Sequence, residues 1–324
     1  MPTADELRLL QALPLELKVE KTKARIREFV EHYGIDNVIV SFSGGKDSTV
    51  LLHLARTVYP EISAVYCNTG LEYPEIQSFV RKQENVQVIR PEMRFDEVIK
   101  TYGYPFVSKE VAQVVYQARR GSQQALRRLN GDGEKSMYSY PKYKQLLDVD
   151  FEISHLCCNE MKKKPLHKLK KASILGTMTE ESRLRKTAWL RTGCNAFENN
   201  KSSPMSFWTS QDVLQYIKDN GIEIASVYGE VVNNNKGKLE CSGCKRTGCI
   251  YCAFGAQSDT INNGDPRFLM LKRTHRKQYD YCMGGGEYDE NGIWKPNKDG
   301  LGMAHCIDVL NKLYYKKYKN FIDY

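Results

Sequence analysis

The sequence predicts an α/β protein built on a mostly parallel β-sheet. Three short runs rich in apolar and β-branched residues, at 37–42, 62–67 and 86–89, alternate with stretches whose apolar residues recur at helical spacing. This alternation is typical of βαβ units, in which crossover helices cover a parallel sheet. The first run is almost continuously apolar, as expected for a strand that is buried on both faces.

The remaining elements follow from apolar spacing and from capping residues. A helix over 16–33 is expected to end at Gly34, because glycine is favoured just beyond a helix C-terminus. Thr209 is predicted to cap a later helix, with Asp212 completing a capping box. A fourth strand is predicted at 172–175, and further helices at 49–56, 73–82, 95–102 and 107–130.

Composition narrows the class of protein. The chain has 324 residues, a net charge of +9 and ten cysteines. It contains no apolar run long enough to cross a membrane, and its first residues lack the apolar core of a secretory signal, so we expect a cytoplasmic protein. In a reducing compartment, clustered cysteines indicate metal binding or catalysis rather than a disulfide framework.

The first predicted strand runs into the sequence Ser-Gly-Gly-Lys-Asp-Ser at 43–48. Glycines allow phosphate oxygens to approach the backbone, and the free N–H groups of the following helix N-terminus donate to them. Ser43 and Ser48 add hydroxyl donors, Lys46 adds a mobile positive charge, and Asp47 can orient the loop or hold Mg²⁺. The pattern is neither a Walker loop nor a dinucleotide-binding GxGxxG turn.

This segment resembles the SGGxDS signature of the PP-loop family, the adenine nucleotide alpha-hydrolase superfamily, which includes N-type ATP pyrophosphatases, thiolation enzymes and PAPS or APS reductases. The resemblance implies a Rossmann-like sheet that binds an adenine nucleotide at the C-terminal ends of its strands. From about residue 231 the composition changes to Asn, Gly, Lys and Cys. We therefore predict an N-terminal helical segment at 1–34, a nucleotide-binding domain at 35–230 and a cysteine-rich C-terminal region at 231–324.

Three further segments extend the resemblance over roughly 35–255. The first segment, at 68–75, resembles the family's DTGxxxPE segment, with Asn68 in place of the acid. The second, at 176–185, resembles the GxxxxESxxR segment of PAPS reductase-like proteins. The third, at 204–209, resembles the family's P(L/I)xxWT segment. Arg183 and Arg185 would face phosphate or sulfate oxygens. The resemblance implies catalytic roles for Lys46, Asp47, Arg183 and Arg185, and nucleotide binding by Ser41, Ser43, Gly44, Gly45, Lys46, Asp47, Ser48, Asn68, Thr69, Gly70, Gly176, Thr177 and Glu181.

Two cysteine pairs resemble the CC…CxxC pattern that holds a [4Fe–4S] cluster in APS reductases: Cys157 with Cys158, and Cys249 with Cys252. Thiolates favour iron–sulfur clusters or zinc over hard cations. One alternative is a compact zinc site formed by Cys241, Cys244, Cys249 and Cys252 alone. The others are a ferredoxin-like spacing of Cys244, Cys249 and Cys252 with a remote fourth ligand, and plain structural or redox thiols. A zinc ribbon separates its pairs by far more than the four residues found here.

Three functions remain open. In the first and preferred one, ATP with Mg²⁺ adenylylates an acceptor, pyrophosphate leaves, and sulfur from a donor protein displaces the adenylate. In the second, a cysteine thiolate reduces PAPS or APS, and a thioredoxin-like protein resolves the product to sulfite. The complete loop at 43–48 favours the first, as does the lack of a C-terminal ECGxH-type tail around Cys306. The third is a nucleotide-binding module without turnover.

Nucleic acid is a weakly supported partner, indicated only by the basic stretch within 107–130 and by tyrosines near 314–318. Arginine and aromatic side chains of this kind can stack on bases, but a solvated helix face gives the same pattern. No membrane partner is expected, and the sequence leaves the sulfur acceptor and the oligomeric state open.

Overall fold

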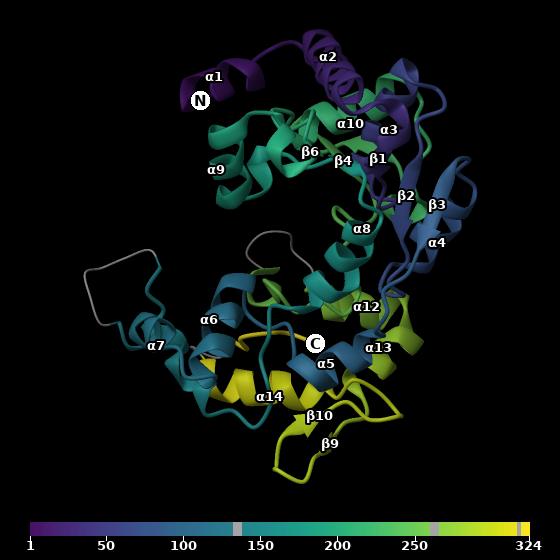
Figure 1. Ribbon diagram of the computed structural model, residues 1–324. Coiled ribbons are helices and arrows are strands. Elements are labelled where there is room, and N and C mark those ends of the chain that lie inside the picture. The colour runs from purple at the N-terminus through teal and green to yellow at the C-terminus, as the bar shows by residue number, and fades with distance from the viewer. Residues whose placement is uncertain (132–137, 260–265, 316–318) are drawn as a thin grey trace. The chain divides into compact units, whose positions relative to one another are not determined.

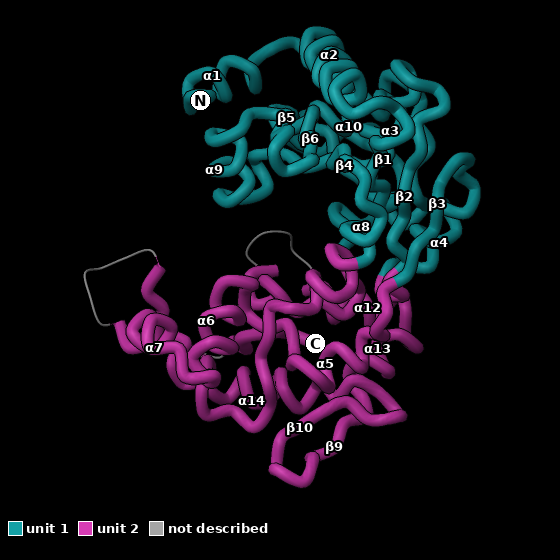
Figure 2. The backbone as a smooth tube through the Cα atoms, viewed as in Figure 1, with its two compact units in different colours: residues 1–68, 72–90, 165–248 teal, residues 69–71, 91–164, 249–324 magenta. Residues whose placement is uncertain are grey.

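The computed structural model describes residues 1–131, 138–259, 266–315 and 319–324. The stretch at 130–144, which its Gly, Ser and Tyr content predicts to be a surface excursion, lies partly outside these residues, at 132–137. The chain forms two compact units (Figure 2): unit 1 consists of 1–68, 72–90 and 165–248, and unit 2 of 69–71, 91–164 and 249–324. The predicted segments 1–34, 35–230 and 231–324 are consecutive, whereas the two units are interleaved along the chain.

Unit 1 contains a six-stranded sheet in the order β3-β2-β1-β4-β6-β5, which confirms the predicted α/β class. Neighbouring strands are parallel except for β5 and β6. The central strand β1 is flanked by β2, where Val40 pairs with Ala64, and by β4, where Val38 pairs with Ala172. The strands are β1 (Val38–Ser41), β2 (Ala64–Cys67), β3 (Val86–Ile89), β4 (Ala172–Leu175), β5 (Asn195–Ala196) and β6 (Lys201–Ser202).

The predicted caps of two helices in unit 1 are confirmed. Gly34 ends α2 with a positive φ of 79°, and Thr209 begins α10 in a capping box with Asp212. A short antiparallel hairpin, β7 (Val231–Asn233) with β8 (Leu239–Cys241), follows α10. The helices of unit 1 are α1 (Ala4–Gln11), α2 (Leu15–Tyr33), α3 (Lys46–Val58), α4 (Pro74–Arg81), α9 (Arg183–Thr192) and α10 (Ser210–Asp219), with α8 (Lys164–Lys168) starting one residue before the unit resumes.

Unit 2 is mainly helical and has its own core, in which Tyr104, Phe106 and Phe151 pack ring against ring. It carries a small hairpin of β9 (Glu287–Tyr288) and β10 (Trp294–Lys295). Its helices are α5 (Phe95–Tyr102), α6 (Lys109–Arg119), α7 (Gln123–Asn130), a π-helical turn at Asn159–Lys163, α12 (Arg267–Thr274), α13 (Arg276–Met283) and α14 (Met303–Tyr314) (Figure 1).

The basic stretch predicted as one helix over 107–130 is two helices, α6 and α7. The break falls at Gly121, whose φ is 85°, a conformation that glycine adopts without strain. Arg119 at the end of α6 donates to the backbone oxygens of Leu146, Val149 and Phe151. Arg119 therefore links α6 to the backbone at 146–151 of unit 2, and its guanidinium is occupied by these hydrogen bonds. Among the described residues no helix is long and apolar enough to span a membrane.

Candidate functional site

The loop between β1 and α3 is shaped by one glycine and by a network of hydroxyl groups. Gly44 has a φ of 71°, and a Cβ there would lie 2.7 Å from side-chain carbons of Ile76 and Val80 in α4. The Ser43 N–H donates to Ser48 Oγ at 3.2 Å, and the Ser48 hydroxyl donates to the Gly45 carbonyl at 2.9 Å. The loop is thus held in shape before any ligand arrives, as an anion site on a helix N-terminus requires.

Lys46 and Asp47 lie in the first turn of α3 rather than in the loop before a helix that was predicted to start at 49. The Lys46 ammonium contacts Asp47 Oδ1 at 2.8 Å, and only 6% of Lys46 is exposed. A buried ammonium needs a paired anion, because its desolvation is otherwise costly. Lys46 is therefore a positioned charge at the start of α3 and not the freely moving one that the sequence indicated.

Gly176, directly after β4, allows that strand to approach the same helix start. A Cβ at Gly176 would lie 3.2 Å from the Asp47 carbonyl oxygen and 3.3 Å from the Ser48 Cα. The next residue, Thr177, shares a hydrogen bond of 2.8 Å with the Ser203 hydroxyl. The pairing of β1 with β4 brings Gly176 close to residues 43–48, here called the phosphate loop after their predicted role. The two were predicted from separate motifs.

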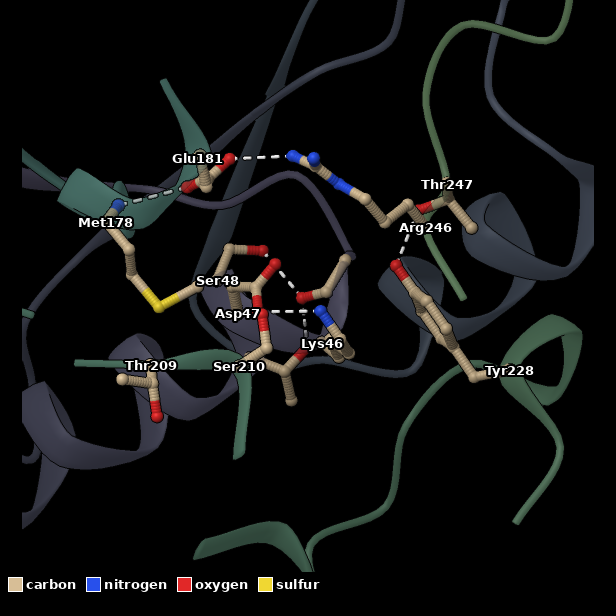
Figure 3. A network of polar contacts seen from close by, with 12 residues as sticks. Lys46, Asp47, Ser48, Met178, Glu181, Thr209, Ser210, Tyr228, Arg246 and Thr247 are labelled. Carbon is tan, nitrogen blue, oxygen red and sulfur yellow. Dashed lines mark hydrogen bonds and ion pairs between the residues drawn. The ribbon is translucent and has the colours of Figure 1, made fainter. Parts of the chain in front are cut away.

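Glu181 is paired with two arginines, of which Figure 3 shows Arg246. Its carboxylate accepts the Met178 N–H at 3.0 Å, forms an ion pair with Arg185, and forms a second ion pair with Arg246 at 2.8 Å. Arg183, at the start of α9, is exposed. Arg185 thus contacts a carboxylate in this structure. Arg246 was missed by the sequence analysis, which treated its surroundings only as a cysteine pattern.

Residues 244–247, here called the Cys244 segment, lie against the phosphate loop. Thr247 Oγ1 and the Tyr228 hydroxyl are 2.5 Å apart, and a Cβ at Gly45 would lie 3.2 Å from that hydroxyl and 3.8 Å from Thr247 Oγ1. The Tyr228 hydroxyl also interacts with the backbone N–H of Lys46, and burial raises the pKa of Tyr228 to about 12. A neutral hydroxyl therefore contacts the backbone N–H of Lys46 in the first turn of α3.

The Cys244 thiol is half-buried and donates to the Arg246 carbonyl oxygen at 2.9 Å. Burial raises the pKa of this thiol, whereas the positive charge of Lys46 acts in the opposite direction. Cys241, at the end of β8, is buried. Burial raises the pKa of its thiol, and the positive charge of Lys46 acts in the opposite direction. Both thiols therefore lie within the electrostatic reach of the phosphate-loop lysine.

The other predicted nucleotide-binding residues lie at strand ends. Ser41 is the last residue of β1, and Asn68 follows β2 directly, where its N–H donates to the Ile89 oxygen at 2.8 Å. Thr69 and Gly70 belong to unit 2, and the Thr69 hydroxyl accepts the Leu71 N–H at 3.2 Å. The roles predicted for these four residues stay predictions.

The four cysteines of the CC…CxxC pattern line one cavity of unit 2, although 91 residues separate Cys158 from Cys249 in the sequence. The other walls of this cavity are mostly apolar. They are formed by Leu71, Phe95, Pro105, Met161 and Lys162.

Contacts around this cavity hold both cysteine pairs in place. A hydrogen bond between the Cys157 and Cys158 thiols raises the pKa of Cys157 and lowers that of Cys158, which Lys109 and Lys162 also lower. Arg267 donates to the backbone oxygens of Cys252 and Phe254 while it is paired with Asp259. No group of three or more His, Cys, Asp or Glu side chains in the described part of the chain has the geometry for a single metal ion.

The cysteines nearest the C-terminus are unsuited to chemistry. Cys282 and Cys306 are both fully buried in unit 2, and burial raises the pKa of each thiol. The Cys282 thiol contacts Met303 Sδ at 3.4 Å, and Cys306 interacts with the Tyr104 hydroxyl. Neither thiol has the exposure or the thiolate character that a nucleophile needs.

A parallel sheet whose central strand runs through a glycine-rich phosphate loop into a helix is the architecture of an α/β phosphate-binding protein. Within that class, the chain belongs to the phosphoadenosine phosphosulfate reductase domain family, whose model matches residues 37–254. The match includes the phosphate loop, the Glu181 segment and all four cysteines that line the cavity of unit 2.

Individual relatives are distant. The chain is 25% identical over 191 residues to an adenosine 5'-phosphosulfate reductase of Bacillus cereus, a match that covers 56% of this chain and 63% of that protein. A probable FAD synthase of Caenorhabditis briggsae is 33% identical over 82 residues, covering 22% of this chain and 16% of the relative. A phosphate complex of phosphoadenylyl-sulfate reductase from Candida auris aligns with 14% identity and a TM-score of 0.37, covering 70% of this chain and 91% of that one.

Proposed function

We propose that this protein is a sulfonucleotide reductase, which reduces adenosine 5'-phosphosulfate (APS) or its 3'-phosphorylated form (PAPS) to sulfite. The observation that carries the proposal is the family match over 37–254, together with relatives named as adenosine 5'-phosphosulfate reductases. The sequence alone favoured ATP-dependent adenylylation over sulfonucleotide reduction. The comparisons with known proteins give better support to reduction. The chain spans about 63% of the curated relatives' length, so the activity is a proposal and not a transfer of their names.

In this proposal the phosphate loop binds the adenylyl phosphate. Glycine at 44 and 45 opens the backbone to the anion, and the N-terminus of α3 supplies donors and a favourable dipole. Lys46, already desolvated and placed by Asp47, offsets the charge of the phosphate group that leaves as sulfur is attacked. Arg183 is the exposed arginine with which the anionic end of the substrate would pair.

We further propose a [4Fe–4S] cluster in unit 2, held by Cys157, Cys158, Cys249 and Cys252. The residues fit such a group: four thiols, the ligands that iron–sulfur clusters use, line one cavity whose other walls are mostly apolar. A bound cluster supplies cross-links between the segments at 157–158 and 249–252, and the lysines at 109 and 162 favour the thiolate form of Cys158.

A second candidate, ATP-dependent adenylylation with sulfur transfer, keeps one specific observation in its favour. The complete Ser-Gly-Gly-Lys-Asp-Ser loop and the Lys46–Asp47 pair suit the release of pyrophosphate, with Asp47 as a ligand for Mg²⁺. Cys306, the last cysteine, is buried and does not replace the C-terminal nucleophile that the resemblance led us to look for.

One assay separates these functions. Anaerobically purified protein is incubated with APS, PAPS or ATP in the presence of dithiothreitol, and sulfite and pyrophosphate are measured in parallel. The proposal predicts sulfite from APS or PAPS and no pyrophosphate from ATP. Pyrophosphate without sulfite would instead support adenylylation, and nucleotide binding without either product would support a module that binds without turnover.

A further inference from the structure

Unit 1 contains a cavity that the proposed reduction does not use. Its volume is about 870 Å³, within the range of roughly 300–1,000 Å³ that is typical of small-molecule sites. Its walls come from α1, from α2, from the end of α9 and from the segment that carries β5 (Figure 1). Every lining residue belongs to unit 1, and none belongs to the phosphate loop, which the structure describes in full.

Much of the lining is apolar. Trp189, Phe197 and Phe207 contribute aromatic rings, and Leu9 and Leu10 of α1 contribute aliphatic side chains. Leu9 is 70% exposed, so a molecule in the cavity would remove apolar surface of this side chain from water. The lining therefore favours a ligand with an apolar body.

The carboxylates that line the cavity already have donors. Glu28 is paired with Arg25 at 2.7 Å and accepts the side-chain N–H of Asn195 at 3.0 Å. Glu6 accepts the Thr3 N–H at 2.6 Å in the capping box of α1. These two are the acidic residues of the lining, so its negative charges are largely satisfied by the protein itself.

Two donors of the lining lack an acceptor. Trp189 is only 5% exposed, and its indole N–H is buried without a hydrogen-bond partner in the described part of the chain. Lys21 is exposed on the face of α2 that also carries Arg25, and it forms no ion pair with any described residue. Because buried polar groups are normally hydrogen-bonded, what this cavity lacks is an acceptor.

We propose that this cavity binds an organic anion with an apolar body, of the class of aromatic and aliphatic carboxylates. The anionic group pairs with the Lys21 ammonium, and the apolar body covers Leu9 and the aromatic rings. An oxygen of the ligand accepts the indole N–H of Trp189 once the ring turns toward the cavity that it lines. The inference goes beyond the proposed reduction and does not depend on it.

The site lies where unit 1 has packing to gain. Trp189 is the only buried side chain of α9, all of whose residues the structure describes. A helix of this length depends on tertiary packing for its stability. A ligand held against Trp189 therefore adds contacts to a helix that has few, and it should raise the unfolding temperature as its concentration rises.

The ligand class is tested by isothermal titration calorimetry with the full chain. Three probes share one apolar body: naphthoate, the uncharged naphthalenemethanol and the cationic naphthylmethylammonium. Decanoate is a second, aliphatic anion. We expect a single site for the anions, affinity for naphthoate roughly tenfold higher than for the alcohol, because a hydrogen bond to a charged group is the stronger one, and no saturable binding of the ammonium.

Variants of α2 test the role of Lys21. Lys21→Gln should lower the affinity for naphthoate to that of the alcohol and leave the affinity for the alcohol unchanged. Arg27→Gln is the matched control, because Arg27 is an exposed cation of the same helix that does not line the cavity. Both side chains are exposed, so neither change should alter the unfolding transition.

The position of the site is tested separately. Cys194 lines the cavity and Cys244 does not, although both are half-buried thiols of unit 1. In the wild-type protein, naphthoate should slow the alkylation of Cys194 by iodoacetamide severalfold, measured by peptide mass spectrometry, and should leave the rate at Cys244 unchanged. Ala24→Trp, which places a large side chain in the cavity from the exposed face of α2, should abolish binding of all probes.

Each outcome supports or overturns one part of the proposal. Equal affinities for naphthoate and the alcohol, or full affinity for naphthoate in Lys21→Gln, overturn the ligand class. Binding without protection of Cys194, or normal binding by Ala24→Trp, overturns the position. No saturable binding of either anion overturns the whole proposal. The protection experiment uses wild-type protein, so it decides the position even if a variant misfolds, and no outcome bears on sulfite release.

Discussion

Arg246 and Glu181 are paired at 2.8 Å although 65 residues separate them in the sequence. Glu181 belongs to the 3₁₀ turn that follows β4, and Arg246 to the Cys244 segment. The same carboxylate also pairs with Arg185 and accepts a backbone N–H. One acidic side chain thus joins a segment next to the phosphate loop to the arginine-containing helix α9.

Removing this carboxylate charge should loosen the Cys244 segment without unfolding the protein. We expect Glu181→Gln to speed the reaction of the Cys244 thiol with iodoacetamide severalfold. The free energy of unfolding should change by only about 1 kcal/mol, because the Arg246 side chain is 65% exposed and such pairs are screened by water. Asp280→Asn, which removes the exposed pair with Arg276 in unit 2, is the control. Equal labelling rates in both variants and wild type would show that Glu181 does not restrain the segment.

Gly44 should tolerate no side chain. Gly44→Ala places a methyl group 2.7 Å from Ile76 and Val80 and also forces alanine into a positive φ. Gly121→Ala has the same backbone problem, with a φ of 85°, but meets no atom within 4 Å. We expect Gly44→Ala to lower the free energy of unfolding by about 1–3 kcal/mol more than Gly121→Ala, measured by urea titration. Similar losses in the two variants would mean that the side chains of Ile76 and Val80 move aside at little cost in stability.

Lys46 should matter for turnover more than for binding. Its charge is already placed beside Asp47, so we expect Lys46→Ala to reduce the rate of product formation by about 10²–10³-fold, the typical effect of removing one preorganised charge donor. Lys186→Ala, on the exposed face of α9, should leave the rate unchanged. Turnover is followed by whichever of sulfite and pyrophosphate the wild type releases, and circular dichroism checks the fold. A near-normal rate for Lys46→Ala would refute the assignment of the loop.

The cluster proposed for the cavity of unit 2 should give the protein a visible colour. Anaerobically purified protein should be brown and contain about four iron and four sulfide per chain. Serine at position 157, 158, 249 or 252 should abolish the colour, because a hydroxyl is a poor ligand for a soft metal centre. Cys67→Ser and Cys241→Ser should keep it, since neither residue lines the cavity. A colourless protein with one zinc that is lost on replacing Cys241 or Cys244, but not Cys157, would favour the compact zinc site.

Local signals in the sequence were sufficient to predict strands of the sheet and the caps of two helices. The strands at 86–89 and 172–175 have the predicted bounds, and Gly34 and Thr209 act as the predicted caps. These features depend on neighbours a few residues away, through β-branched side chains, a positive φ or a capping hydrogen bond. The phosphate loop was readable for the same reason, because its glycines, hydroxyls and helix start are contiguous.

The sequence by itself therefore determined the α/β class, the glycine-rich turn at 43–48 between a strand and a helix, and the spacing of the two cysteine pairs. Only the tertiary structure decided that Lys46 is buried against Asp47, that Arg185 and Arg246 share Glu181, that the cysteine pairs line one cavity, and that Cys306 is enclosed. The physical reason is that burial and ion pairing depend on which distant segments pack together. The chain passes from one unit to the other after residues 68, 71, 90, 164 and 248. Each unit is therefore built from segments that are far apart in the sequence, and a local pattern does not indicate which of them pack together.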